Sequence, residues 1–150
     1  MKKFKFGLDR LLRLRELRER DQARVLGEAL ADERERRARV ERASEQVERA
    51  GEQVLRSADG SVTAGAMRNL GLTLQAAVLA AEAAATAHRE AQESVVREQD
   101  RFGEARRDRR VLEKLREKRH EGWSVESTRV EQRESDGLTE ARRHTQRGDA

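Results

Sequence analysis

The sequence of 150 residues contains no cysteine, no proline and no tyrosine, and aromatic side chains make up only 3% of it. Without cysteine there are no disulfides and no thiolate metal ligands, which favours the cytosol. Hydrophobic residues reach 35%, many of them alanine, while charged residues reach 41%. This composition cannot fill a globular interior, but it suits long helices, because Arg, Glu, Ala and Leu are strong helix formers. We therefore predict an extended, all-α protein.

The sequence also lacks a long uninterrupted apolar run. The most apolar stretch, residues 72–87, contains Gln75 and Glu82 and falls short of the roughly 20 residues that a membrane span requires. The opening Met1-Lys2-Lys3 resembles the start of a signal peptide, but arginines and acids follow where an apolar segment should be. We expect a protein that stays in the cytoplasm.

Apolar residues recur at alternating spacings of three and four in the second half of the chain. A repeat of 3.5 residues keeps one stripe of a helix facing a partner, as in a coiled coil. Eleven of the fourteen positions in this stripe are apolar: Met67, Leu70, Leu74, Ala77, Ala81, Ala84, His88, Ala91, Val95, Glu98, Phe102, Ala105, Arg109 and Leu112. This stripe predicts the seam of a long helix over residues 66–121.

A second seam precedes the first, in a helix predicted over residues 8–56. It is rich in leucine at its start, blurred by charges over residues 32–39, and regular again from Val40 to Val54. Between the seams, residues 57–65 contain the turn dipeptide Asp59-Gly60, and Ser61 or Thr63 can cap the next helix. A short loop favours an antiparallel coiled-coil hairpin of residues 1–121, in which facing residue numbers sum to about 120.

The remaining residues, 122–150, form a predicted C-terminal extension that is partly helical or disordered. Gly122 weakens the helix there, the seam pattern is lost, and we expect fraying after about Gly137. Trp123 and Phe4 are predicted to lie close together at the open base of the hairpin, with Phe6 nearby. They either seal the base or anchor a partner.

Two basic blocks lie at opposite ends of the sequence. Residues 1–20 and residues 106–119 each carry eight basic and three acidic side chains, a net charge of +5 in each block. The hairpin brings both blocks to its base. A charge run is most often a solvated face with intrahelical ion pairs, but this convergence favours a protein partner. Too few aromatic residues are present for base stacking, so we do not expect nucleic-acid binding.

No catalytic, cofactor or metal site is predicted. Gly60 and Gly65 have the spacing of a phosphate loop, but Ala66-Met67 stands where Lys and Ser or Thr should follow. His120-Glu121 lacks the second histidine of a zinc motif, and the other histidines are distant in sequence. The acids have no pocket in an open coiled coil that would shift their pKa values.

Several short motifs resemble the flagellar export protein FliJ family. The first is the opening run Phe4-Lys5-Phe6-Gly7-Leu8-Asp9-Arg10-Leu11-Leu12-Arg13-Leu14-Arg15-Glu16. The others are Met67-Arg68-Asn69-Leu70, then Leu112-Glu113-Lys114-Leu115-Arg116-Glu117-Lys118-Arg119, and last Glu131-Gln132 followed by Asp136. They occur in the family's order and cover most of the chain.

This resemblance implies a non-enzymatic antiparallel coiled coil, similar to the stalk of rotary ATPases. It implies that the protein stands in the centre of the hexameric export ATPase (FliI), and that the far end contacts the export gate protein (FlhA). Because the two basic blocks meet at the base, we expect the ring to be contacted by Arg10, Arg13, Arg106, Arg110 and Arg116. The resemblance also implies that the protein escorts export chaperones and works at the cytoplasmic face of the cell membrane. His88 matches a histidine of the family's gate-contacting surface.

The chain departs from that surface in places. Ala77 and Ala81 stand where some members have aromatic residues, and Gly137 replaces an acid near the end. Two alternatives remain at this point. One is a basic coiled coil that binds nucleic acid or a membrane surface, with the N-terminal Leu/Arg stretch as an amphipathic anchor. The other is the equivalent stalk of a virulence type III secretion system.

Overall fold

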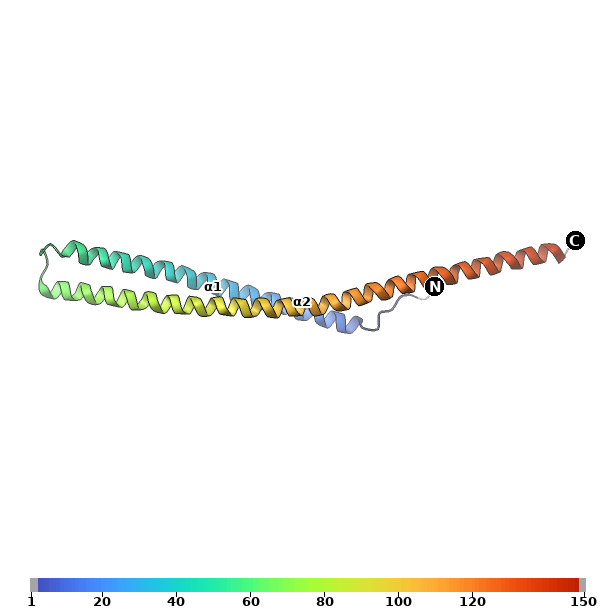
Figure 1. The fold of residues 1–150 in the computed structure, drawn as a ribbon, viewed down its shortest axis with the longest axis horizontal. Helices are drawn as coiled ribbons and strands as arrows, with labels where there is room; N and C mark the ends of the chain where they lie inside the picture. Colours follow the sequence, from blue (N-terminus) through green and yellow to red (C-terminus); the bar gives the residue numbers. More distant parts are fainter. Residues whose placement is uncertain (1–2, 149–150) are drawn as a thin grey trace. The chain divides into compact units, whose positions relative to one another are not determined.

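The protein is an all-α helical hairpin in which two long helices pack together, as the sequence predicted. The structure, a computed structural model, describes residues 3–148, with side chains over residues 3–137. In this described range the chain forms α1 (Asp9–Ser57) and α2 (Ala64–Gly148), and no strand (Figure 1). The first helix agrees with its predicted bounds to within one residue.

The second helix is longer than the sequence suggested. We expected it to end near residue 121, and this was wrong, because α2 continues through Gly122 and Gly137 to Gly148. A glycine inside a helix costs only about 1 kcal/mol relative to alanine. With no proline in the chain, nothing stronger interrupts the helix. Fraying beyond Gly137 stays a prediction, as does the division into residues 1–121 and 122–150.

The chain divides into two compact units. The central unit, Arg20–Glu104, holds most of α1, the loop and the first part of α2. The terminal unit combines the residues up to Glu19 with those from Ala105 onward. Each unit therefore contains one segment from each helix.

In the central unit, α1 and α2 meet along small residues. Ala43, Ala50 and Ala91 are buried, and Val95 is 9% exposed. The charges of residues 32–39 do not break the α1 seam, because Glu33 and Arg36 take two of its positions and are half-buried. Side chains as small as alanine leave open grooves beside the seam.

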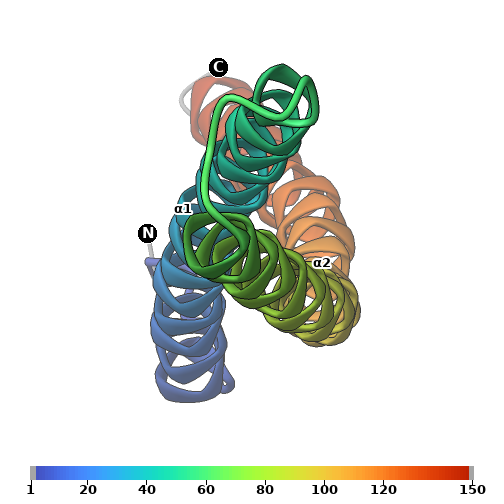
Figure 2. The ribbon, with the colours of Figure 1, turned by 90° about the vertical axis from the view of Figure 1, so that its left-hand side faces the viewer.

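The loop, residues 58–63, joins the helices at the end seen nearest the viewer in Figure 2. Gly60 has a φ of 85°, a left-handed conformation that favours glycine. The Thr63 hydroxyl accepts a hydrogen bond of 3.2 Å from the Ala66 amide, and so caps the start of α2. Of the two capping residues considered from the sequence, Thr63 is the one that acts.

In the terminal unit, the start of the chain lies along α2 (Figure 1). Leu12 and Ala105 are each 3% exposed and Phe6 is 4% exposed, so they form a small core. Phe4 faces His120, slightly further along α2 than the predicted sum of about 120 would place it. None of the fourteen predicted α2 seam positions is exposed.

Candidate functional site

Two arginines of the terminal unit form ion pairs that hold the two helices together. Arg15 donates to Asp108 at 2.6 Å, while Arg109 donates to Glu19 on the other helix and pairs with Glu113. The hydrogen bond to Glu19, followed by the contact with Glu113, raises the pKa of the Arg109 guanidinium above its ordinary value. The pairs with Asp108 and Glu19 join α1 to α2, so the positive charges of Arg15 and Arg109 are neutralised within the hairpin.

Other arginines of the terminal unit are exposed and do not pair with the opposite charges that hold Arg15 and Arg109. We call this set the base surface: Arg10, Arg13, Arg106, Arg110 and Arg116. Within the part of the chain whose side chains are described, only Arg116 has an ion-pair partner, Asp9 at 3.9 Å. The segments that carry the set lie side by side, because Arg15 bonds to Asp108 between them. The structure thus brings the predicted arginines onto one unit, and four of the five have no ion-pair partner among the described side chains.

Exposed apolar side chains accompany these arginines. Leu14 is 63% exposed and Leu17 is 58% exposed on α1, and Val111 is 66% exposed on α2. Leucines at exposed positions among exposed arginines are typical of a protein-binding or membrane-binding surface, not of one that contacts only phosphates. The main prediction assigned the leucine-rich run to the seam, and only the alternative of an amphipathic anchor left its leucines exposed.

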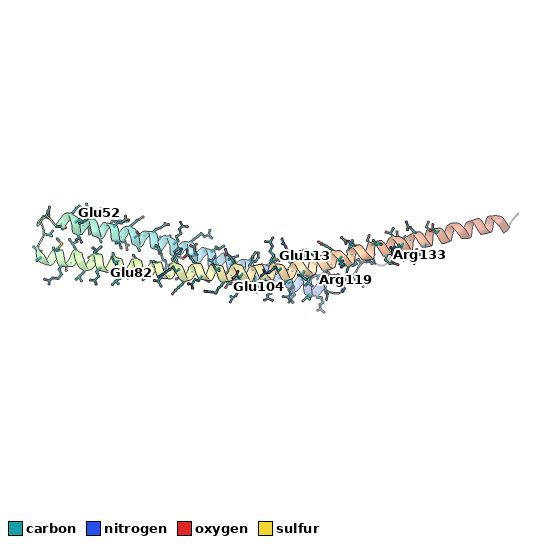
Figure 3. All side chains as sticks on the ribbon, in the orientation of Figure 1. Glu52, Glu82, Glu104, Glu113, Arg119 and Arg133 are labelled. Atoms are coloured by element: carbon teal, nitrogen blue, oxygen red, sulfur yellow. The ribbon has the colours of Figure 1, made fainter. Side chains whose placement is uncertain are left out.

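The predicted proximity of Phe4 and Trp123 at the base is confirmed. The Phe4 and His120 ring centroids lie 5.0 Å apart in an edge-to-face arrangement, and Trp123 lies 5.9 Å from Phe4. Phe6 lies below the Arg119 guanidinium, 5.9 Å from its carbon. Figure 3 labels Arg119 and Glu113 on the same stretch of α2. The sequence did not predict His120 in this cluster, because the residue of α2 that faces Phe4 depends on the exact register between the two segments.

His88, the predicted gate contact, lies in the central unit. Its Nε2 is 2.7 Å from Glu33 Oε1, and the two side chains are only 18% and 20% exposed. His88 is therefore a packed histidine that is hydrogen-bonded across the hairpin. Its role toward a partner stays a prediction.

A second exposed apolar set lies near the loop. We call it the tip surface, and it consists of Leu55, Leu72, Val78 and Leu79, with Leu55 76% exposed. Ala77 lines a groove of about 410 Å³ on one side of the seam, and Ala81 lines one of about 380 Å³ on the other. Val78 is the tip-surface residue that lines one of these grooves, while neither groove is lined by a leucine.

The same part of α2 is unusually apolar for a helix in water. By length and composition alone it contains one stretch that could cross a membrane, with a mean hydropathy of 1.4 and none of it buried. We had judged this stretch too short. A single stretch of this kind is weak evidence for a span, and its seam face contacts α1, so we attribute its hydropathy to the seam and the tip surface.

The side chains of residues 3–137 offer no group of three His, Asp or Glu residues that could hold a metal ion. The exposed arginines of the base surface and the exposed apolar side chains of both surfaces suit binding to a partner.

Comparison with protein families shows the family of the chain that carries these surfaces. The family model described as "Flagellar FliJ protein" matches residues 4–148. The chain belongs to the FliJ family. Membership makes it a component of flagellar type III protein export, associated with the export apparatus in the cytoplasm, and the family is non-catalytic. No curated protein and no solved structure matches the chain.

Proposed function

We propose that this FliJ-family chain acts as a stalk inside the hexameric export ATPase, FliI, with the base surface inserted in the ring. The observation that carries the proposal is the positive charge of the base surface, where four of the five arginines have no ion-pair partner among the described side chains. Exposed arginines beside exposed leucines suit a protein lumen that offers both carboxylates and apolar walls. The ATPase supplies all of the chemistry, and this chain has no enzymatic activity of its own.

The tip surface is the proposed contact for the export gate protein, FlhA. Its exposed leucines and the two grooves beside Ala77 and Ala81 offer apolar area and places for a partner's side chains. His88 lies further along the same helix, and it would contribute by leaving Glu33 for the gate. The proposal also includes binding of export chaperones by this chain and a location at the cytoplasmic face of the cell membrane.

ATP hydrolysis by the cognate export ATPase tests the base. We expect the purified chain to stimulate hydrolysis, and the triple variant Arg10→Glu, Arg13→Glu and Arg110→Glu to lose that stimulation. The matched control reverses three exposed charges of the central unit: Arg34→Glu, Arg42→Glu and Arg68→Glu. Equal stimulation by the two triple variants would refute the insertion of the base surface, provided that both remain helical by circular dichroism.

Binding to the purified cytoplasmic part of the gate protein tests the tip. The double variant Leu72→Asn and Leu79→Asn should weaken binding at least tenfold, because burying a leucine side chain at an interface is worth about 1.5–3 kcal/mol and asparagine loses that burial. The control is Val125→Asn with Val130→Asn, two exposed apolar positions of the terminal unit. If the control weakens gate binding as much as the tip variant does, the assignment is wrong.

A second candidate is attachment of the base to an anionic membrane surface. It is favoured by the exposed Leu14 and Leu17 among the arginines of α1. Co-sedimentation with vesicles across a salt series separates it from the stalk, because binding to lipid charge falls steeply with salt. The flagellar description of the family favours a flagellum over a virulence secretion system.

A further inference from the structure

We infer that the groove beside Phe4 is a binding site for an arginine side chain presented by a partner protein. The groove lies within the terminal unit, has a volume of about 450 Å³, and is lined by Phe4, Glu113, Arg116, Glu117, His120 and Glu121. The base surface as a whole attracts anions. Arg116 belongs both to the base surface and to this groove, but the groove also carries three carboxylates and so has the opposite preference, and its assignment does not rest on the proposed function.

The negative charge of the groove comes from three carboxylates on one face of α2. Glu113, Glu117 and Glu121 follow one another at intervals of four residues, so they lie one above the other along the helix. Glu113 is paired with Arg109, whereas Glu117 and Glu121 have no ion pair within the described side chains. Like charges at this spacing destabilise a helix by about 0.2–0.5 kcal/mol per pair. Arg116, which also lines the groove, pairs with Asp9, so a cation from outside the chain would neutralise Glu117 and Glu121.

The aromatic wall of the groove is the second, independent observation. Phe4 is half-buried and stands against His120 and Trp123 at 5.0 and 5.9 Å, so its ring is held in place. Phe6 already has a cation above its ring, Arg119, at 5.9 Å. No such cation lies over the ring of Phe4 in the described part of the chain. An aromatic face beside carboxylates is the combination that binds guanidinium ions.

Arginine fits this groove better than lysine. A guanidinium is planar and can stack on Phe4 while its N–H groups donate to two carboxylates, whereas an ammonium is a compact, strongly hydrated charge. The surrounding basic block repels an isolated cation. We therefore assign the site to an arginine that is held in a folded or extended partner segment, which adds contacts of its own.

Calorimetric titration of the full chain tests the site, with a short peptide of alternating arginine and glycine as the probe. At physiological salt we expect saturable binding, accompanied by a change in fluorescence of Trp123, the single tryptophan. A lysine peptide of equal length should bind several-fold more weakly. An acidic peptide that produced the Trp123 change while the arginine peptide did not would overturn the proposal.

Variants separate the groove from general electrostatics. The double variant Glu117→Gln and Glu121→Gln should bind the arginine peptide about tenfold more weakly, because it removes two charge-assisted hydrogen bonds. The control, Glu131→Gln with Glu134→Gln, removes the same charge from exposed positions further along α2 and should bind as the parent does. Phe4→Leu should remove the preference for arginine over lysine. Equal affinities for the two double variants would overturn the assignment.

Discussion

Replacing Glu98 by leucine should stabilise the hairpin, although it removes an ion pair. Glu98 occupies a seam position of α2 and is 8% exposed. One carboxylate oxygen accepts a hydrogen bond from Arg101 at 2.8 Å, while the other is buried without a partner. On the α1 side of the central unit, Gln22 carries a second buried oxygen that lacks a partner.

The magnitude follows from what each atom loses and gains. Removing a buried oxygen that has no hydrogen bond recovers about 1–3 kcal/mol. Leucine adds apolar burial, for which full burial is worth about 1.5–3 kcal/mol, although the CH₂ groups of Glu98 already supply part of it. The lost pair with Arg101, whose own side chain is 63% exposed, costs only about 0.2–1 kcal/mol. A net gain of about 2 kcal/mol results.

Thermal unfolding followed by circular dichroism measures this gain. For a chain of this length, about 2 kcal/mol corresponds to a rise in Tm of about 4–8 °C. Glu104→Leu, at an exposed position six residues further along α2, is the control and should change Tm little. The Tm must be the same at two protein concentrations, because a leucine in the seam can also favour association between chains. A lower Tm for Glu98→Leu, or equal shifts for both variants, would refute the reasoning.

Three further predictions concern stability. Leu12→Ala should lower the free energy of unfolding in urea by about 2–5 kcal/mol, because Leu12 is 3% exposed, whereas Leu14→Ala, at a 63% exposed position, should change it by less than about 0.5 kcal/mol. Arg109→Met should cost about 1–3 kcal/mol in the same assay, since Glu19 loses its partner while only 17% exposed, and Arg107→Met should be nearly neutral. Hydrogen bonds from the Ser61 hydroxyl, and then from its amide, lower the pKa of Asp59 below 3.8, so this acid stabilises the fold above its unfolded pKa and loses that effect as the pH falls through its folded value. Asp59→Asn should therefore flatten the dependence of Tm on pH slightly below about pH 4, and an unchanged acid limb would contradict the effect.

The seams were predictable because a repeat of 3.5 residues can be read directly from spacing. The repeat placed Met67 and Leu112 on one face, and the turn dipeptide Asp59-Gly60 marked where the two seams are joined. The repeat also continues through the charged residues 32–39, where Glu33 and Arg36 occupy seam positions and are half-buried. The repeat follows from the geometry of the helix backbone, so a polar residue at a single seam position does not interrupt it.

The end of α2 and the details of the surfaces could not be predicted in the same way. Gly122 was taken as a helix end, but its cost is small compared with the helix-forming residues around it. The sequence does not distinguish arginines that form ion pairs between the helices from arginines that do not. Only the register of the two helices shows that Arg15 and Arg109 are paired across the hairpin. A shift of a few residues in register decides whether Phe4 meets His120 or a residue one turn away.

A distance measurement between the two arms of the terminal unit tests the central claim most directly. The chain has no cysteine, so Arg18→Cys and Arg107→Cys can carry two spin labels at exposed positions, with excess unlabelled chain added to dilute contacts between molecules. Packed helices lie about 8–10 Å apart, and with the length of the labels the hairpin predicts a single distance below about 30 Å that dilution does not change. A longer distance, or a short one that disappears on dilution, would show that the two basic segments do not come together within one chain.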